Sequence, residues 1–261
     1  MTNNKLRYII ETMMRKYLVG LWFLLLIPPP LFSQDINPQE IVRLSDNLMR
    51  GDTSQGKYTM SVTTPNWKRT LELQAYNMGR DKTFIRILSP AKEAGITTLR
   101  IGTNMWNYLP KVERTIKIPP SMMLQSWMGS DFTNDDLVKE SSVVHDYTHK
   151  IMEKKTVDAQ TVYVIELIPK PESAVTWGKL IFWIRAADYV PLREEFYSED
   201  GRLIKLLEYS QVKKMSGRNI PTIWKMISQA KPGNETTIEV IEVEYNQPVD
   251  ENIFSLANLK K

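Results

Sequence analysis

The sequence predicts a mainly β protein whose antiparallel sheet curls or closes on itself. Short segments in which apolar and polar residues alternate follow one another along most of the chain, as half-buried strands do. Turn residues such as glycine, asparagine and aspartate separate these segments. The chain has one long helix pattern near its start, and no helices alternate with the strands as a parallel sheet requires.

Residues 1–33 predict a secretory signal peptide. A basic pair precedes an apolar run from Leu18 to Ile27, and prolines and the small residue Ser33 follow it. The run is shorter than the roughly 20 residues that cross a membrane as a helix, so an uncleaved N-terminal anchor is the weaker alternative. Met14 is an alternative start. We expect residues 34–261 to be the mature protein, folded as a single domain.

Net charge and cysteine content exclude several function classes. The chain carries a net charge of +4, but most of this excess lies in residues 1–33, and the remainder is nearly neutral. A nearly neutral protein lacks the basic excess that neutralises phosphates, so we expect no nucleic-acid partner. Cysteine is absent, which excludes disulfides, thiolate chemistry and lipid attachment to an N-terminal cysteine. The hydrophobic core alone must therefore stabilise the fold.

An amphipathic helix is the first element expected after residue 34. Asn37 suits the helix cap, Pro38 the first helical position, and Glu40 completes a capping box. Gly51 ends the pattern. One face of the helix is apolar and must pack against another element; it comprises Ile41, Leu44 and Leu48.

Strand patterns occupy most of the remaining chain. Residues 70–88 and 97–110 each predict a hairpin, the first turning near Gly79 and the second at Gly102. Further strands are expected within residues 161–169, 179–185, 191–212, 220–228 and 235–245. The alternation slips between Val240 and Ile241, which predicts a β-bulge. Residues 161–169 are apolar on both faces, so the first helix and the middle of the chain are expected to cover the second face.

The middle of the chain departs from the strand pattern. Residues 121–128, SMMLQSWM, predict a short helix that is apolar nearly all round. Methionine is flexible and polarizable, which suits a surface that receives varied apolar partners, although an ordinary core helix is the alternative. Thr133 and Asp136 predict a capping box for a following helix. Gly129 and Asp131 belong to the expected hinge, and the spacing counted from Asp131 does not fit a calcium loop.

These motifs carry a family resemblance. The capped helix, the hairpins, "GTNMWNYLPKVERTIKIPP" and "WMGSDFTNDDL" resemble the LolA-like family of outer-membrane lipoprotein-sorting proteins, over roughly Pro38 to Leu259. The resemblance implies an unclosed antiparallel β-barrel, or half-barrel, with a few short helices covering its concave apolar face. It also implies a monomeric periplasmic carrier for the acyl chains of lipoproteins or other lipids. Its expected partners are an inner-membrane transporter and an outer-membrane acceptor, with transient membrane-protein contact.

Physical chemistry favours the same role. Burying each methylene of an acyl chain gains roughly 0.8 kcal/mol, so a carrier must enclose the chain in a soft apolar surface. The expected ligand-binding residues of the cavity or its lid are Trp106, Tyr108, Met122, Met123, Leu124, Trp127, Met128 and Phe132, followed by Phe84 and Trp183. An ordinary core position is the alternative for each of them.

No catalytic or metal site is predicted, and no cofactor. His145 and His149 lie in a strand-like segment, where this spacing sets the two rings roughly 13 Å apart. Asp135 and Asp136 are adjacent, so their side chains diverge and suit acid–base catalysis poorly. Phosphate-loop, HExxH and GxSxG motifs are absent from the sequence, which leaves a cell-envelope hydrolase as a weak option.

Two non-enzymatic functions are compatible with the sequence. The first is the carrier described above. The second is a periplasmic accessory subunit that docks on an inner-membrane exporter and carries nothing. The second would use an exposed apolar patch where the first uses a filled cavity.

Overall fold

The computed structural model describes residues 36–139, 143–173 and 175–261. The expected signal peptide, residues 1–33, lies outside the described residues. The strands are β1 (Thr53–Thr63), β2 (Lys68–Met78), β3 (Lys82–Ser89), β4 (Thr97–Ile101), β5 (Asn104–Leu109), β6 (Arg114–Lys117), β7 (Tyr147–Val157), β8 (Gln160–Pro169), β9 (Lys179–Arg185), β10 (Pro191–Tyr197), β11 (Leu203–Met215), β12 (Arg218–Ser228) and β13 (Glu235–Tyr245). The helices are α2 (Pro38–Arg50) and the short α3 (Asn134–Lys139).

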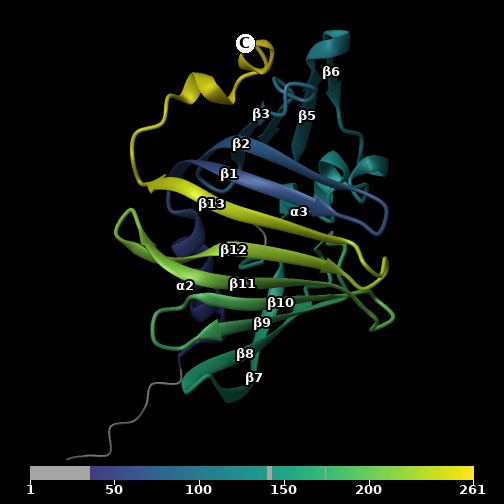
Figure 1. Ribbon diagram of the computed structural model, residues 1–261. Helices are drawn as coiled ribbons and strands as arrows, with labels where there is room; N and C mark the ends of the chain where they lie inside the picture. Colours follow the sequence, from purple (N-terminus) through teal and green to yellow (C-terminus); the bar gives the residue numbers. More distant parts are fainter. Residues whose placement is uncertain (1–35, 140–142, 174) are drawn as a thin grey trace, which may run out of the picture. The chain divides into compact units, whose positions relative to one another are not determined.

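All of these strands form one antiparallel sheet. Its order is β6-β5-β4-β3-β2-β1-β13-β12-β11-β10-β9-β8-β7, so that strands adjacent in the sheet are also consecutive in sequence, except where β1 pairs with β13. Because β6 and β7 stand at the two edges, the sheet is an unclosed half-barrel (Figure 1). This confirms the expected fold class. Residues 37–261 form one compact unit.

The alternation of apolar residues located most strands correctly. Hairpins turn at Gly79 between β2 and β3 and at Gly102 between β4 and β5, as predicted. The predicted bulge is also present, because the pairing of β1 with β13 skips Ile241. Strand β1 was not predicted. Its buried positions include Ser54 and Gly56, which weaken the apolar signal.

Helix α2 begins and ends where its capping residues indicate. The Asn37 side chain accepts a hydrogen bond from the backbone N–H of Gln39 at 3.0 Å, and Gly51 closes the helix with a φ of 67°. The capping box is incomplete, because Glu40 instead accepts hydrogen bonds from Arg43. The helix packs on β7, β9 and β12 through its buried face, which confirms it as a cover of the sheet.

The C-terminal segment covers one face of β3–β5. Two 3₁₀ helices, η5 (Glu251–Phe254) and η6 (Asn258–Lys260), lie against β3, β4 and β5. Their buried side chains Phe254 and Leu259 pack on Phe84 and Leu99. This cover is formed by residues that no strand or long-helix pattern singled out.

Candidate ligand-binding cavity

A cavity of about 230 Å³ lies between α2, residues 127–137 and the facing surface of the sheet. Its wall is mainly apolar and aromatic. The apolar lining comprises Met49, Leu73, Ala75, Ile85, Leu137, Val143, Val175, Leu180, Leu207, Met226 and Ile238, and the aromatic lining comprises Tyr58, Trp127, Phe132, Tyr147, Trp177, Phe182, Phe196, Tyr209 and Trp224. This volume is somewhat below the roughly 300–1,000 Å³ of pockets that hold drug-sized ligands.

Strand geometry decides which side chains reach the cavity. Successive residues of a strand point to opposite faces. Ile85 lines the cavity, whereas its neighbour Phe84 packs under the C-terminal segment. Phe182 likewise lines the cavity, whereas Trp183 on the other face donates a hydrogen bond to Glu195 at 3.1 Å.

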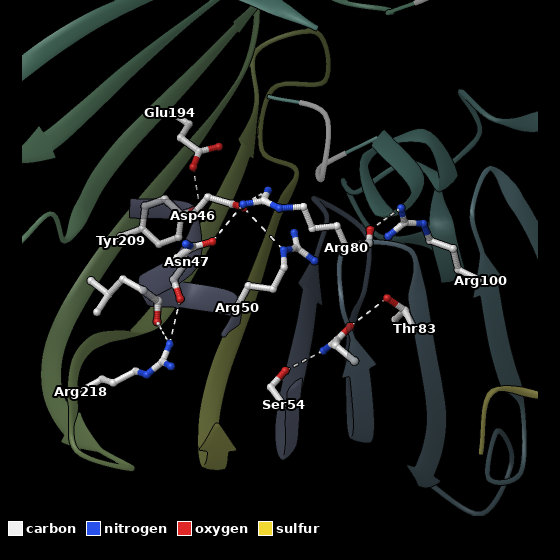
Figure 2. A network of polar contacts seen from close by, with 12 residues as sticks. Asp46, Asn47, Arg50, Ser54, Arg80, Thr83, Arg100, Glu194, Tyr209 and Arg218 are labelled. Atoms are coloured by element: carbon white, nitrogen blue, oxygen red, sulfur yellow. Dashed lines mark hydrogen bonds and ion pairs between the residues drawn. The ribbon is translucent and has the colours of Figure 1, made fainter. Parts of the chain in front are cut away.

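Charged side chains of α2 form one polar part of the wall. Asp46, which is 10% exposed, forms ion pairs with Arg50, at 3.5 Å between Nε and Oδ1, and with Arg80 (Figure 2). Arg80 also donates a hydrogen bond to the Asn47 side chain at 2.9 Å. Asp46 and Arg50 line the cavity themselves. Carboxylate and guanidinium charges are thus placed on the wall of a mainly apolar cavity.

A row of neutral polar side chains crosses β1, β2 and β3 on the cavity face. The Asn77 amide donates to Ser54 at 3.0 Å and accepts from Thr83 at 2.8 Å (Figure 2). All three residues line the cavity. Because these groups hydrogen-bond to one another, the row tolerates an apolar neighbour better than unsatisfied polar groups would.

Three aromatic rings and a carboxylate form a further part of the wall. The ring centroid of Trp224 lies 6.1 Å from that of Tyr58 and 6.3 Å from that of Tyr209. The Tyr209 hydroxyl donates to Glu194 at 2.9 Å (Figure 2). Burial raises the pKa of Tyr58 well above the usual range of a phenol, so its hydroxyl stays neutral.

Residues 119–137, here called the covering segment, close the cavity on another side. The predicted helix over residues 121–128 is wrong: two single 3₁₀ turns, η2 (Pro120–Met122) and η3 (Trp127–Gly129), replace it. Backbone groups that a helix would use internally bond to the returning chain. The Trp127 N–H donates to the Phe132 carbonyl at 2.7 Å, and the Asn134 N–H donates to the Gln125 carbonyl at 3.0 Å. Tertiary hydrogen bonds therefore override the local pattern.

The turn that follows agrees with the predicted capping box. The backbone N–H of Thr133 donates to the Asp136 carboxylate at 2.7 Å, and the N–H of Asp136 donates to the Thr133 hydroxyl at 3.1 Å. Gly129 has a φ of 69°, a conformation that suits glycine, and the Asp131 carboxylate accepts from Thr236 at 2.8 Å. The capping box thus begins α3 at the end of the covering segment, and Asp131 ties the segment to β13.

Two aspartates fix α3 to the rest of the wall. Asp136 pairs with the ammonium of Lys205, a β11 residue that is only 4% exposed. Asp135 accepts a hydrogen bond from the Thr176 hydroxyl at 2.6 Å. The Lys205 ammonium also lies 4.7 Å from the ring centroid of Trp177, so a cation–π contact accompanies the ion pair.

The predicted ligand residues of the covering segment fall into two groups. Trp127, Phe132 and the cap residue Asp136 line the cavity. Met122, Met123 and Met128 pack, partly buried, against the core cluster that contains Trp127, and Leu124 is 59% exposed.

The four remaining predicted residues lie away from the cavity lining. Phe84, Trp106 and Tyr108 belong to the cluster that the C-terminal segment covers. Trp183 lies on the outer face, where the Lys155 ammonium is 4.8 Å from its ring centroid. Their aromatic character predicted burial or contact, but it did not reveal which face of the sheet they occupy.

Other lining residues were not predicted to be part of a site. Tyr58 belongs to a strand that the sequence did not reveal, and Asp46 and Arg50 lie in the predicted amphipathic helix but outside the apolar face expected for it. Phe182, Tyr209 and Trp224 lie in predicted strands. Alternation separates the two faces within each strand, but it does not say which faces of different strands coincide or which face is concave.

Metal and membrane features are limited in the described part of the chain. No three histidine, aspartate or glutamate side chains converge there in a way that could hold a metal ion. The His149 ring lies 2.8 Å from the Val143 carbonyl. Among the helices of the described residues, none has the length and apolarity needed to cross a bilayer.

Comparisons with known proteins agree with this architecture. A family model described as "Uncharacterized protein" matches residues 79–261. A DUF1329 family protein from Desulfovibrio piger shares 24% identity at a TM-score of 0.77, over 85% of this chain and 99% of its own. A LolA superfamily protein from Nitrosomonas europaea shares 23% identity at a TM-score of 0.73, again over 85% and 99%. An outer membrane lipoprotein-sorting protein domain from Vibrio parahaemolyticus shares 23% at 0.74, over 86% and 98%. No curated protein matches the sequence significantly.

Proposed function

This chain belongs to the family whose model matches residues 79–261, its fold is LolA-like, and from that premise we propose that it carries acyl chains through the periplasm. Its cargo is the acyl chain of a lipoprotein or another lipid, moved toward the outer membrane by a monomeric, non-catalytic protein. The observation that supports this role is the apolar cavity enclosed by α2, the sheet and the covering segment.

The energetics of the cavity suit reversible binding. Ten methylenes transferred from water into an apolar enclosure gain about 8 kcal/mol before the cost of ordering the chain is subtracted. The cavity of about 230 Å³ accepts a single chain, and a bulkier cargo requires the covering segment to move. This segment consists of short turns with flexible methionines, so it can move without unfolding the sheet.

Delivery requires partners at both membranes. The expected signal peptide places the protein in the periplasm, where an inner-membrane transporter would supply the cargo and an outer-membrane acceptor would take it. Leu124 supports a role for the covering segment in such contacts, because this apolar residue of the segment is 59% exposed.

A second candidate is an accessory subunit that docks on an inner-membrane exporter and carries nothing. The β5–β6 hairpin favours it, since Val112 and Ile116 are 57% and 40% exposed there. Such exposed apolar side chains mark surfaces that contact other proteins. The two candidates differ in whether lipid accompanies the protein.

Native mass spectrometry and lipid extraction of residues 34–261, purified from a periplasm without denaturation, test the carrier. We expect a stoichiometric acylated species. The variant Ala75→Phe fills the cavity and should abolish it, whereas Gln74→Phe, the preceding position on the opposite face of β2, should retain it. An empty wild-type protein that also fails to bind added lipid would refute the carrier and favour the accessory subunit.

A further inference from the structure

The row of neutral polar side chains on the cavity face lies at one level of three adjacent strands. Ser54 of β1 pairs with Asn77 of β2, and Asn77 pairs with Thr83 of β3. All three side chains line the cavity, and only 4% of Ser54 is exposed. The row is therefore a strip of polar groups within a mainly apolar wall (Figure 2).

The row has more hydrogen-bond donors than its own bonds use. Each of the two hydroxyls supplies one proton and the amide supplies two, which makes four. The bond between Asn77 and Ser54 and the bond between Thr83 and Asn77 use one proton each. This count is the same for either orientation of the amide. Within the described part of the chain, the two remaining protons have no protein acceptor.

Donors on a buried wall require an acceptor. An N–H or O–H group that is removed from water without a partner costs free energy, and proteins leave donors unpaired less often than acceptors. A purely apolar ligand that excludes water from the cavity leaves the surplus donors without a partner. A carbonyl oxygen accepts hydrogen bonds and donates none, so it complements this surplus.

The wall beside the row is apolar. Residues two positions apart in a strand share a face and lie about 7 Å apart. Ala75 and Leu73 continue the cavity face of β2 from Asn77. Leu73 belongs to the core cluster that contains Trp127 of the covering segment. The cavity face of β2 thus passes from polar to apolar, which is the order of groups in an acyl chain with its linkage at one end.

We propose that Ser54, Asn77 and Thr83 bind the carbonyl oxygen through which the acyl chain is joined to the rest of the cargo. The inference rests on the proposed carrier function and gives the chain a direction. The carbonyl lies at the row, and the methylenes run over the apolar residues of β2 toward the covering segment. The carbonyl belongs either to an ester or to an amide, and both present the same acceptor to the row.

Displacement of an apolar fluorescent probe from residues 34–261 tests this with three ligands of one chain length. Monotetradecanoylglycerol has an ester carbonyl, and its amide analogue has an N–H in place of the ester oxygen. In O-tetradecylglycerol a methylene replaces the carbonyl, so this ether reports on the chain and the glycerol alone. We expect a carbonyl ligand to bind about fivefold more tightly than the ether. A preference for the ester alone would support an ester-linked cargo, and a preference that includes the amide would support an N-acylated one as well.

Substitution of the whole row locates this preference. The triple variant Ser54→Ala/Asn77→Leu/Thr83→Val replaces every donor with an apolar side chain, so it should abolish the preference and still bind the ether. The double variant Ser54→Ala/Asn77→Leu leaves only the hydroxyl of Thr83 and should reduce the preference to about twofold. Affinity for the ether shows in each case that the cavity is intact.

A matched control lies on the opposite face of the same two strands. Ser61 of β1 and Thr70 of β2 are paired across the strands, and their hydroxyls hydrogen-bond to each other at 2.9 Å. Ser61 lies an odd number of positions from Ser54 and therefore points away from the cavity. Ser61→Ala/Thr70→Val removes a hydrogen-bonded pair of the same kind and should keep the wild-type preference.

Infrared spectroscopy of the bound ester observes the carbonyl directly. A hydrogen bond to a carbonyl oxygen lowers its stretching frequency. With an isotopically labelled carbonyl, the band of the bound ester should lie at lower frequency in the wild-type protein than in the triple variant. The same band position in both proteins would place the carbonyl away from the row and overturn the assignment.

The binding outcomes separate this inference from the function on which it rests. Equal affinities for the ether, the ester and the amide in the wild-type protein would overturn the carbonyl site and leave the carrier intact. A preference for carbonyl ligands that persists in the triple variant would also overturn it. Failure of all three ligands to displace the probe would overturn the carrier function together with the inference.

Discussion

Lys205 of β11 and Asp136 at the start of α3 form an ion pair in which both side chains are largely buried, with 5% and 12% of their surfaces exposed. The Asp136 carboxylate also accepts the capping hydrogen bond from the Thr133 N–H at 2.7 Å. One carboxylate therefore neutralises a buried ammonium and begins a helix. The pair joins the covering segment to the sheet at the cavity wall. Its loss should therefore destabilise both the covering segment and the sheet.

Removing either charge of this pair should destabilise the protein strongly. Lys205→Met or Asp136→Leu leaves the other charge buried without its partner, and each should lower the free energy of unfolding by about 3–5 kcal/mol. The double variant should cost less than the sum of the two, because no uncompensated charge remains. Urea unfolding of all four proteins gives the coupling energy, and additive effects would contradict the ion pair.

Adjacent residues of β9 should respond differently to substitution. Phe182 lines the cavity, so Phe182→Leu should weaken binding of an acyl ligand several-fold. Trp183→Leu should leave binding unchanged and lower stability by roughly 1–2 kcal/mol, since it removes the hydrogen bond to Glu195 and the contacts with Lys155 and Arg193. Probe displacement and urea unfolding measure the two effects. Loss of ligand binding in Trp183→Leu alone would reverse the assigned faces.

The comparison of Phe182 with Trp183 shows why the strands were predictable and the site was not. Alternation along the chain reveals that two neighbouring side chains point to opposite faces. It does not reveal which of the two faces is concave when both faces are apolar, as they are in β3 and β9. Phe84 was therefore expected in the cavity, whereas the C-terminal segment covers it.

The prediction of a helix over residues 121–128 failed for a different reason. The apolar run at residues 121–128 has the composition of a buried helix, but Met128 adopts a φ of 50° and the backbone bonds to the chain that returns after it. Such long-range hydrogen bonds leave no trace in local periodicity. The capping box of Thr133 and Asp136 was predictable because its partners lie three residues apart.

The cover provided by the C-terminal segment should be essential to stability. Phe254 is 5% exposed and packs on Phe84 and Leu99. Phe254→Ala should therefore lower the free energy of unfolding by about 3–5 kcal/mol, as large-to-small substitutions in a core do. Leu256→Ala is a suitable control, since Leu256 is 49% exposed in the same segment and should change stability by less than about 0.5 kcal/mol. Equal effects in thermal or urea unfolding would show that the segment does not pack as described.

The pH dependence of stability should reveal the environment of His149. Burial lowers the pKa of His149 below its ordinary value of 6.5, and the positive charge of Lys170 acts in the same direction, while the hydrogen bond to the Val143 carbonyl opposes them. The unfolded chain therefore binds this proton at a higher pH than the folded chain. The contribution of His149 to stability is complete above about pH 6.5 and is lost as the pH falls from there through the folded-state pKa.

Urea unfolding between pH 8 and pH 5.5 measures this contribution. The free energy of unfolding should fall on the acid side by at most about 1.4 kcal/mol per pH unit for one proton. His149→Gln should flatten this dependence, because glutamine can replace the hydrogen bond to Val143 but does not titrate. The segment that holds the His149 ring also supplies Val143 and Tyr147 to the cavity wall, so acid-induced weakening should loosen ligand binding over the same pH range. An unchanged slope in His149→Gln would mean that this ring is solvated and that the wall beside Val143 is looser than the structure indicates.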